Sequence, residues 1–403
     1  MTKTKAPTRA ADDLRGVSKL AIDATTGITD LVEAMHRNIA RIPGITPSLE
    51  DGKTNGITGF VYRTVRGVTK VVGGGIDAAL ALASPMFGNF TDIPARDALQ
   101  SALNGVLGDH LVATNNPLAI SMQFCRNGEA LPLSKDAKNT LASAIPDATG
   151  TVLVLIHGLC MNDRQWNMAR PDGTLHDHGA ELQKDLGYTA IYLRYNTGLH
   201  VADNGKAFAT ALESLLAAWP VKVKELVIVA HSMGGLITRS ACHYADDNAQ
   251  TWRKSLKKIV FLGTPHQGAP LERGGHWIDI ILGATPYASP FAKLGKVRST
   301  GITDLRHGSV VEGDGNRGHA LLPLPAKVKC FAIAATTGKQ SGDLHDRLLG
   351  DGLVPLASAL GEHADPARSL NFPTERKVTL YATNHMQLLN AAPAYEAVRA
   401  FLR

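Results

Sequence analysis

The sequence contains few cysteines, and none of them is placed for a metal site or a redox pair. Its 403 residues include four cysteines, Cys125, Cys160, Cys242 and Cys330, which lie far apart. Zinc sites and dithiol redox motifs need closely spaced cysteines. We therefore expect four buried free thiols.

Long apolar runs are also missing. No uninterrupted apolar stretch reaches the length of a transmembrane helix. The first residues, MTKTKAPTRAADDLRG, are partly basic but lack the apolar core and small-residue cleavage site of a secretory signal. These features predict a cytoplasmic protein.

A concentrated basic block is missing as well. The formal net charge is +6, but the 42 basic residues are offset by 36 acidic ones spread along the chain. This pattern predicts no nucleic-acid partner, although it leaves open attraction to an anionic membrane surface. Hydrophobic residues at 44% and charged residues at 19% indicate a folded globular protein.

Residues 1–115 lack convincing strand patterns and predict a helical N-terminal extension broken by glycine-rich turns. One apolar helix face is indicated by the spacing of Val65, Val68, Val72, Ile76 and Leu80. Gly73, Gly74 and Gly75 weaken that helix. Two interpretations remain: helices packed on the main domain, or amphipathic helices in peripheral contact with a membrane or lipid surface.

From about residue 116 the pattern changes to that of an α/β domain. Asn127-Gly128 lies in SMQFCRNGEALPL and is typical of a tight hairpin turn. Apolar strand-like runs then alternate with helical segments at 151–157, 189–195, 225–231, 258–264, 329–335 and 377–383. Such continuous apolar strands predict a mostly parallel sheet with helices on both faces, over residues 116–403.

The alternation stops between residues 266 and 326, where HWIDIILGATPYASPFAKLG occurs. A cap or lid inserted in the catalytic domain is one interpretation of this stretch. The other is a helix in a surface loop without a gating role.

Ser232 is the predicted nucleophile. In KELVIVAHSMGGLITRSA it directly follows an apolar strand and precedes a helix start rich in small residues. A strand, a sharp turn and a helix form a nucleophile elbow, which needs small residues two positions before and after the serine. These positions hold Ala230 and Gly234. The alternative is an ordinary serine at a helix N-cap.

Two backbone N–H groups are predicted to form the oxyanion hole. The run TVLVLIHGLCMNDRQW ends a buried strand at His157-Gly158-Leu159, where the fold supplies one donor from Leu159. The second donor is Met233, directly after the nucleophile. Gly158 is expected to let the loop turn beneath the substrate carbonyl. His157, Gly158 and His231 are predicted to be substrate-binding residues.

The predicted base is His385. On a parallel sheet with such a nucleophile elbow, the triad occurs along the chain in the order Ser, then Asp or Glu, then His. His385 follows the last predicted strand in KVTLYATNHMQLLN. His266, in LGTPHQGAP, is the second candidate, but its position indicates a pocket-lining residue.

The predicted acid is Asp351 in DGLVP, because it follows the strand KCFAIAA and can orient an imidazole. Asp343 and Asp346 are nearby alternatives. The resulting mechanism needs no metal and no organic cofactor.

Together, VLIHGL, VAHSMGGL, FLGTPHQGAP, DGLVP and NHMQLL resemble bacterial lipases and esterases of the α/β-hydrolase superfamily. They look especially similar to the branch related to glycosylphosphatidylinositol inositol deacylases. The resemblance covers residues 118–403 and implies ester hydrolysis, often of acyl lipids. We therefore predict a serine carboxylic ester hydrolase that acts on an apolar acyl ester through an acyl-enzyme. A cluster from Trp277 to Leu282 is expected to line the acyl pocket.

Two other functions remain open. One is acyl transfer, or cleavage of an intracellular polyester, through the same acyl-enzyme. The other is a non-catalytic membrane-binding or partner-binding protein on a hydrolase scaffold.

Overall fold

The chain divides into two compact units. The structure is a computed structural model. It describes residues 12, 15, 16, 18, 19, 94–133, 137–170, 172–269, 299–312, 322–340 and 350–403. One unit comprises Met1–Ile93 with Leu111–Ala119, and the other comprises Pro94–His110 with Ile120–Arg403. The sequence assigned residues 94–110 to the N-terminal extension, whereas the structure assigns Pro94–His110 to the larger unit.

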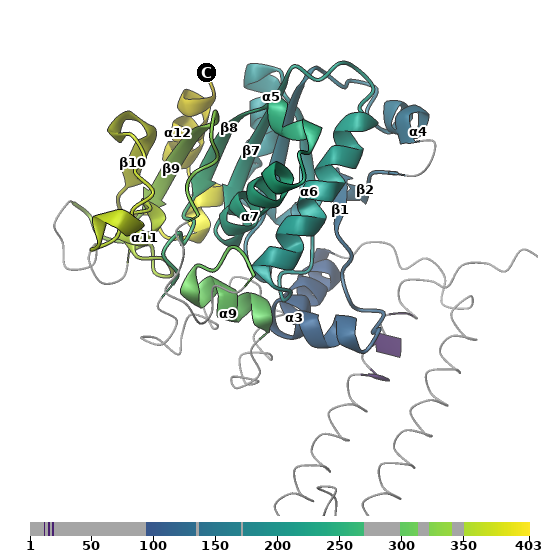
Figure 1. The fold of residues 1–403 in the computed structure, drawn as a ribbon, viewed down its shortest axis with the longest axis horizontal. Coiled ribbons are helices and arrows are strands. Elements are labelled where there is room, and N and C mark those ends of the chain that lie inside the picture. Colours follow the sequence, from purple (N-terminus) through teal and green to yellow (C-terminus); the bar gives the residue numbers. More distant parts are fainter. Residues whose placement is uncertain are drawn as a thin grey trace, which may run out of the picture. The chain divides into compact units, whose positions relative to one another are not determined.

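The larger unit is built on one sheet of eight strands in the order β10-β9-β8-β7-β3-β6-β1-β2 (Figure 1). The strands are β1 (Gln123–Arg126), β2 (Glu129–Ala130), β3 (Thr151–Ile156), β6 (Thr189–Arg194), β7 (Glu225–His231), β8 (Leu256–Leu262), β9 (Lys329–Ala335) and β10 (Lys377–Leu380). Strand β1 is antiparallel to β2 and β6, and the other neighbours are parallel. This confirms the predicted α/β-hydrolase fold with a mostly parallel sheet.

The hairpin at the sheet edge turns where the sequence predicted it. Asn127 and Gly128 both adopt positive φ angles, 53° and 77°. Two consecutive positive φ angles are required by the type I′ turn, whose twist matches that of the flanking strands.

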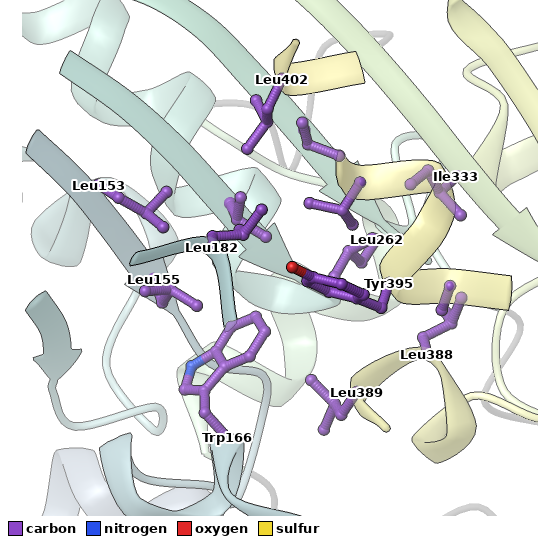
Figure 2. Packing of buried hydrophobic residues seen from close by; sticks show 14 of the residues in the cluster. Leu153, Leu155, Trp166, Leu182, Leu262, Ile333, Leu388, Leu389, Tyr395 and Leu402 are labelled. Atoms are coloured by element: carbon purple, nitrogen blue, oxygen red, sulfur yellow. The ribbon is translucent and has the colours of Figure 1, made fainter. Parts of the chain in front are cut away.

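The central strands are apolar throughout because helices cover both faces of the sheet. Every residue of β7 except Glu225 is buried. Figure 1 shows α6 (Val201–Ala217) and α7 (Met233–Asp247) side by side on one face. On the other face, Leu153 and Leu155 share a core cluster with residues of α5 (His178–Leu186) and α12 (Ala392–Leu402) (Figure 2).

The remaining described elements are short, apart from α3. They are α3 (Pro94–Ala113), α4 (Ala137–Ala144), α9 (Thr300–His307), α11 (Leu356–Ala359), and the small sheet of β4 (Met168–Ala169) and β5 (Leu175–His176). Single 3₁₀ turns η2 (Asp163–Trp166), η3 (Thr251–Lys254), η5 (Pro366–Arg368), η6 (Thr374–Arg376) and η7 (Met386–Leu389) complete the list. In the described part of the chain, no helix is long and apolar enough to cross a membrane.

Helix α9 belongs to the stretch that the sequence marked as an insertion. Ser299 caps it by accepting a hydrogen bond from the backbone N–H of Ile302, and Gly308 ends it in a left-handed conformation. The Ser299 hydroxyl also donates to the carbonyl of Gly105 in α3, at 2.6 Å. Residues 270–298 and 313–321 lie outside the described residues, so gating by a lid stays a prediction.

Candidate active site

Ser232 occupies a sharp turn between β7 and α7. Its backbone has φ 53° and ψ −123°, a conformation that costs a residue other than glycine on the order of 1–3 kcal/mol. Its N–H donates to the carbonyl of Leu262, at 2.8 Å, which ties the turn to the end of β8. Its side chain does not cap α7. The turn therefore presents the hydroxyl instead of using it to complete the helix.

Glycines after Ser232 allow the turn to pack against neighbouring strands. A Cβ atom at Gly234 would lie 2.7 Å from the carbonyl oxygen of Ile156. At Gly235 it would lie 2.0 Å from Oγ1 of Thr264. Such distances are far below van der Waals contact, so a side chain here would force the helix away from the sheet.

His385 and Asp351 form a buried pair at the ends of β9 and β10. Nδ1 of His385 lies 2.6 Å from Oδ2 of Asp351, and both side chains are buried. The other carboxylate oxygen, Oδ1, accepts the N–H groups of Leu353 and Val354, at 3.0 and 2.8 Å. The backbone N–H of His385 donates to the Asp351 carbonyl, at 3.0 Å. The acid and the imidazole are thus fixed by both their backbones and their side chains.

Gly263 provides the space in which the imidazole sits. It follows β8 and has φ 56°. A Cβ atom there would lie 3.1 Å from both Nδ1 and Cε1 of His385, and 2.7 Å from Leu388. A larger residue at this position would displace the ring from Asp351.

Ser232 and His385 line one small cavity of about 20 Å³. This is room for roughly one water molecule. Its other lining residues are Gly158, Leu159, Cys160, Met161, Gln165, His231 and Met386. In the described ranges no hydrogen bond joins the Ser232 hydroxyl to His385, and such contacts commonly tighten only when substrate binds. Because Asp351 engages Nδ1, Nε2 is the nitrogen of His385 available to the serine.

Of the two predicted oxyanion donors, Leu159 lines this cavity, and Met233 directly follows Ser232 at the start of α7. Met233 begins α7, so its N–H has no partner within the helix. Leu159 lies in the facing loop, where neither its N–H nor that of Met233 donates to another described residue. That loop is held by the N–H of Cys160, which donates to Oγ1 of Thr197 at 3.1 Å. The start of a helix also favours negative charge.

His157 is buried and does not line the cavity. Its ring stacks on Tyr195, with centroids 4.4 Å apart, and its Nδ1 donates to the Gly158 carbonyl at 2.9 Å. Burial lowers the pKa of this imidazole to about 4. It is placed to support the loop rather than to touch a substrate.

His266 is also set back from the cavity. Its ring packs against Phe261 and Phe372, with centroids 4.8 and 5.5 Å away. Burial holds its pKa well below the ordinary value. Trp277, the other residue predicted to contact substrate, lies outside the described residues, as do the alternative acids Asp343 and Asp346.

His231 borders the cavity. Its Nε2 lies 3.2 Å from the carbonyl oxygen of His385, and the two rings are 4.6 Å apart. Because a carbonyl oxygen can only accept, Nε2 carries the proton. Burial and the neighbouring His385 keep the pKa of His231 well below its ordinary value.

Sequence reasoning did not identify Gln165, Met386 or Thr197. Gln165 lines the cavity from η2, where its side chain accepts the N–H of Asn162 in a capping box. The N-x-x-Q spacing was a readable signal for that turn, but nothing local places it beside Ser232. Across the described ranges, no group of three or more His, Cys, Asp or Glu side chains could hold a metal ion.

Comparison with known families gives this geometry a context. The family model described as "PGAP1-like alpha/beta domain" matches residues 147–339. This PGAP1-like match includes Ser232 and the predicted oxyanion segments, whereas Asp351 and His385 lie beyond its end. None of the curated proteins compared with the chain matches it.

Similar solved structures include several lipases and esterases. The mature lipase BlEst2 of Bacillus licheniformis is 18% identical with a TM-score of 0.41, covering 62% of this chain and 91% of that one. A lipase-esterase related protein from Clostridium acetobutylicum is 15% identical with a TM-score of 0.35, covering 63% and 96%. The ester-hydrolase EH1AB1 from the Lake Arreo metagenome has the same identity and TM-score, covering 63% and 73%.

Proposed function

We propose that the protein is a serine carboxylic ester hydrolase with Ser232 as nucleophile, His385 as base and Asp351 as orienting acid. The observation that carries the proposal is the strained turn at Ser232, beside a cavity that also contains an imidazole paired at 2.6 Å with a buried carboxylate. A serine hydroxyl alone is a weak nucleophile at neutral pH and needs such a base.

In the proposed reaction, Oγ of Ser232 attacks the ester carbonyl carbon while Nε2 of His385 takes the hydroxyl proton. The N–H groups of Leu159 and Met233 stabilise the oxyanion. His385 then gives its proton to the leaving alkoxide, and an acyl-enzyme remains. A water molecule, deprotonated by His385, attacks this ester, and the acid is released with Ser232 restored.

An apolar acyl group is the substrate feature that the cavity favours. Leu159, Met161 and Met386 contribute thioether and aliphatic surface beside Ser232. Such surface gains free energy by contact with hydrocarbon but offers no partner to a charged acyl chain. We propose a lipid-like carboxylic ester as the substrate class.

The deciding test compares the natural protein with Ser232→Ala on p-nitrophenyl esters of increasing chain length, triacylglycerols and polyester granules. We expect Ser232→Ala to lower kcat on the order of a millionfold. A fluorophosphonate probe should label only the natural protein. Turnover retained by clean Ser232→Ala protein would refute the mechanism, and no turnover of any ester would point to a non-catalytic scaffold.

A further inference from the structure

A second set of buried histidines lies behind the segment that carries His385. Arg170 lies in the connection between β4 and β5, and its guanidinium is 2.7 Å from Nδ1 of His176. Nε2 of His176 is 2.6 Å from Nδ1 of His178. Nε2 of His178 is 2.9 Å from the carbonyl oxygen of Leu388, three residues after His385. The contacts form one continuous chain from a cation to the backbone of η7.

The direction of every hydrogen bond in this chain is determined by its two ends. A guanidinium can only donate, so Nδ1 of His176 accepts. A neutral imidazole with Nδ1 accepting carries its proton on Nε2, so His176 donates to Nδ1 of His178. His178 is then also protonated on Nε2, and it donates to Leu388. The final acceptor, a carbonyl oxygen, requires the same direction.

Burial keeps both rings in the neutral form that this chain needs. His176 and His178 are 2% and 0% exposed. Desolvation, together with the charge of Arg170, lowers the pKa of His176 to about 4. Desolvation and the neighbouring His176 lower the pKa of His178 to about 3. Protonation of either ring would turn an acceptor into a donor and break the chain.

His231 makes the corresponding bond on the other side of the same segment, donating from Nε2 to the carbonyl of His385. Trp166 packs between the two systems, with ring centroids 6.0 Å from His178 and 6.5 Å from His231. The short stretch from His385 to Leu388 therefore receives an imidazole N–H at each end. A buried carbonyl left without a donor is unfavourable, so each bond resists displacement of the segment.

We propose that His178 and His231 are positioning residues that fix the segment from His385 to Leu388, and that Arg170 and His176 set the tautomer of His178. The inference rests on the proposed function, because it assigns the purpose of this fixation to the base of that reaction. A displacement of about 1 Å at a reacting group can cost on the order of a hundredfold in rate. The positioning residues act on kcat through His385 and do not touch the substrate.

The test uses two substitutions of His178 that differ in reach. In His178→Gln the amide nitrogen occupies the place of Nε2 and can still donate to Leu388. In His178→Asn the amide ends at the place of Nδ1 and cannot. Tyr395→Phe is the matched control, since this ring packs on both histidines while its hydroxyl, among the described residues, bonds only to Asp185, at 2.7 Å.

We expect His178→Asn to lower kcat for a Ser232-dependent ester about 10- to 100-fold with KM changed less than about threefold. His178→Gln should keep most of kcat, and Tyr395→Phe should keep all of it even where its melting temperature falls. If His178→Asn does not fold, Arg170→Met is a second test, with kcat lowered about three- to tenfold. This variant also removes the bond from Nε of Arg170 to the carbonyl of Asn390, at 3.0 Å, so it is paired with the tautomer measurement below. Equal kcat for the Gln and Asn variants, or a loss of kcat that only follows melting temperature, would overturn the inference.

A measurement without substrate separates this inference from the proposed function. In ¹⁵N-histidine spectra at pH 7, we expect His176 and His178 to be neutral and protonated on Nε2. An Nδ1-protonated tautomer at either ring would refute the hydrogen-bond chain from Arg170 to Leu388, even in an active enzyme. Turnover that survives Ser232→Ala would refute the proposed function and leave the tautomers unaffected.

Discussion

At the scale of single residues, the two oxygens of Asp351 have separate tasks. Oδ2 faces Nδ1 of His385, and Oδ1 holds the turn through Leu353 and Val354. An amide at this position can keep one of these tasks but not both. Loop structure and orientation of the base can therefore be separated by one substitution.

Asp351→Asn should lower kcat on the order of ten-thousandfold while the turn persists. The amide oxygen can replace Oδ1 as acceptor, but the amide NH₂ then faces Nδ1 and stabilises the wrong imidazole tautomer. Steady-state kinetics and thermal unfolding of the variant measure the two effects separately. A loss in kcat below tenfold would show that Asp351 is not the orienting acid.

The residues that sequence reasoning identified are those whose roles depend on local pattern. Ser232 follows an apolar strand and precedes a glycine-rich helix start, and the loops after β9 and β10 contain Asp351 and His385. Thr197 gave no such signal, because its bond to the loop at Cys160 spans 37 positions. The order of strands in the sheet decides which loops lie next to each other, and a local sequence pattern does not specify that order.

At the scale of elements, apolar runs located the strands well because buried parallel strands are apolar on both faces. Strands β7 and β9 occupy 225–231 and 329–335, as predicted. Strand β10 ends at Leu380, three residues before the predicted end. Ala382 has φ 49°, and this left-handed residue turns the chain toward His385. The strand therefore ends at this turn, although the sequence pattern predicted that it continues to residue 383.

A buried ion pair connects β6 to the η2 turn beside the cavity. Nε of Arg194 lies 2.5 Å from Oδ1 of Asp163, and the side chains are 10% and 2% exposed. Arg194→Met should lower the free energy of unfolding by about 3–5 kcal/mol, because it leaves a buried carboxylate without its partner. Urea unfolding at pH 7 measures the change.

The double variant Arg194→Met/Asp163→Leu is the matched control for this pair. Removing both charges should recover much of the loss, since a buried ion pair and an apolar pair of similar volume are nearly equal in free energy. A double variant as unstable as Arg194→Met would mean that packing, rather than the unpaired charge, causes the loss.

At the scale of the whole molecule, buried neutral histidines couple stability to pH. His157, His178, His231 and His266 are buried with their pKa values lowered, mainly by desolvation. In the unfolded chain a histidine takes up its proton near pH 6.5, whereas these rings stay neutral in the folded protein. The stability that they contribute is therefore complete above pH 6.5 and is lost as the pH falls toward 4.

We expect the free energy of unfolding to decrease steadily between pH 7 and pH 4. His157 alone, with its pKa lowered to about 4, accounts for about 3 kcal/mol across this window. Urea titrations at several pH values give the slope, and His157→Phe should reduce it. A flat profile from pH 7 to pH 5 would contradict the assignment of these rings as neutral.

Peripheral contact of residues 1–115, which the sequence predicts to be helical, with a lipid surface remains our proposal. Vesicle sedimentation of the full chain against a shortened one tests it, but the cut must respect α3. Gly105 lies directly against Cys160, where an added Cβ would be 2.2 Å from Sγ, and Ser101 accepts a hydrogen bond from the side chain of Asn162 at 3.1 Å. Deletion of residues 1–110 would remove these α3 contacts to the loop at Cys160 and Asn162. Such a variant would lose activity for a reason unrelated to membrane binding. Deletion of residues 1–93 keeps the α3 contacts, so vesicle binding and turnover can be compared in one sample.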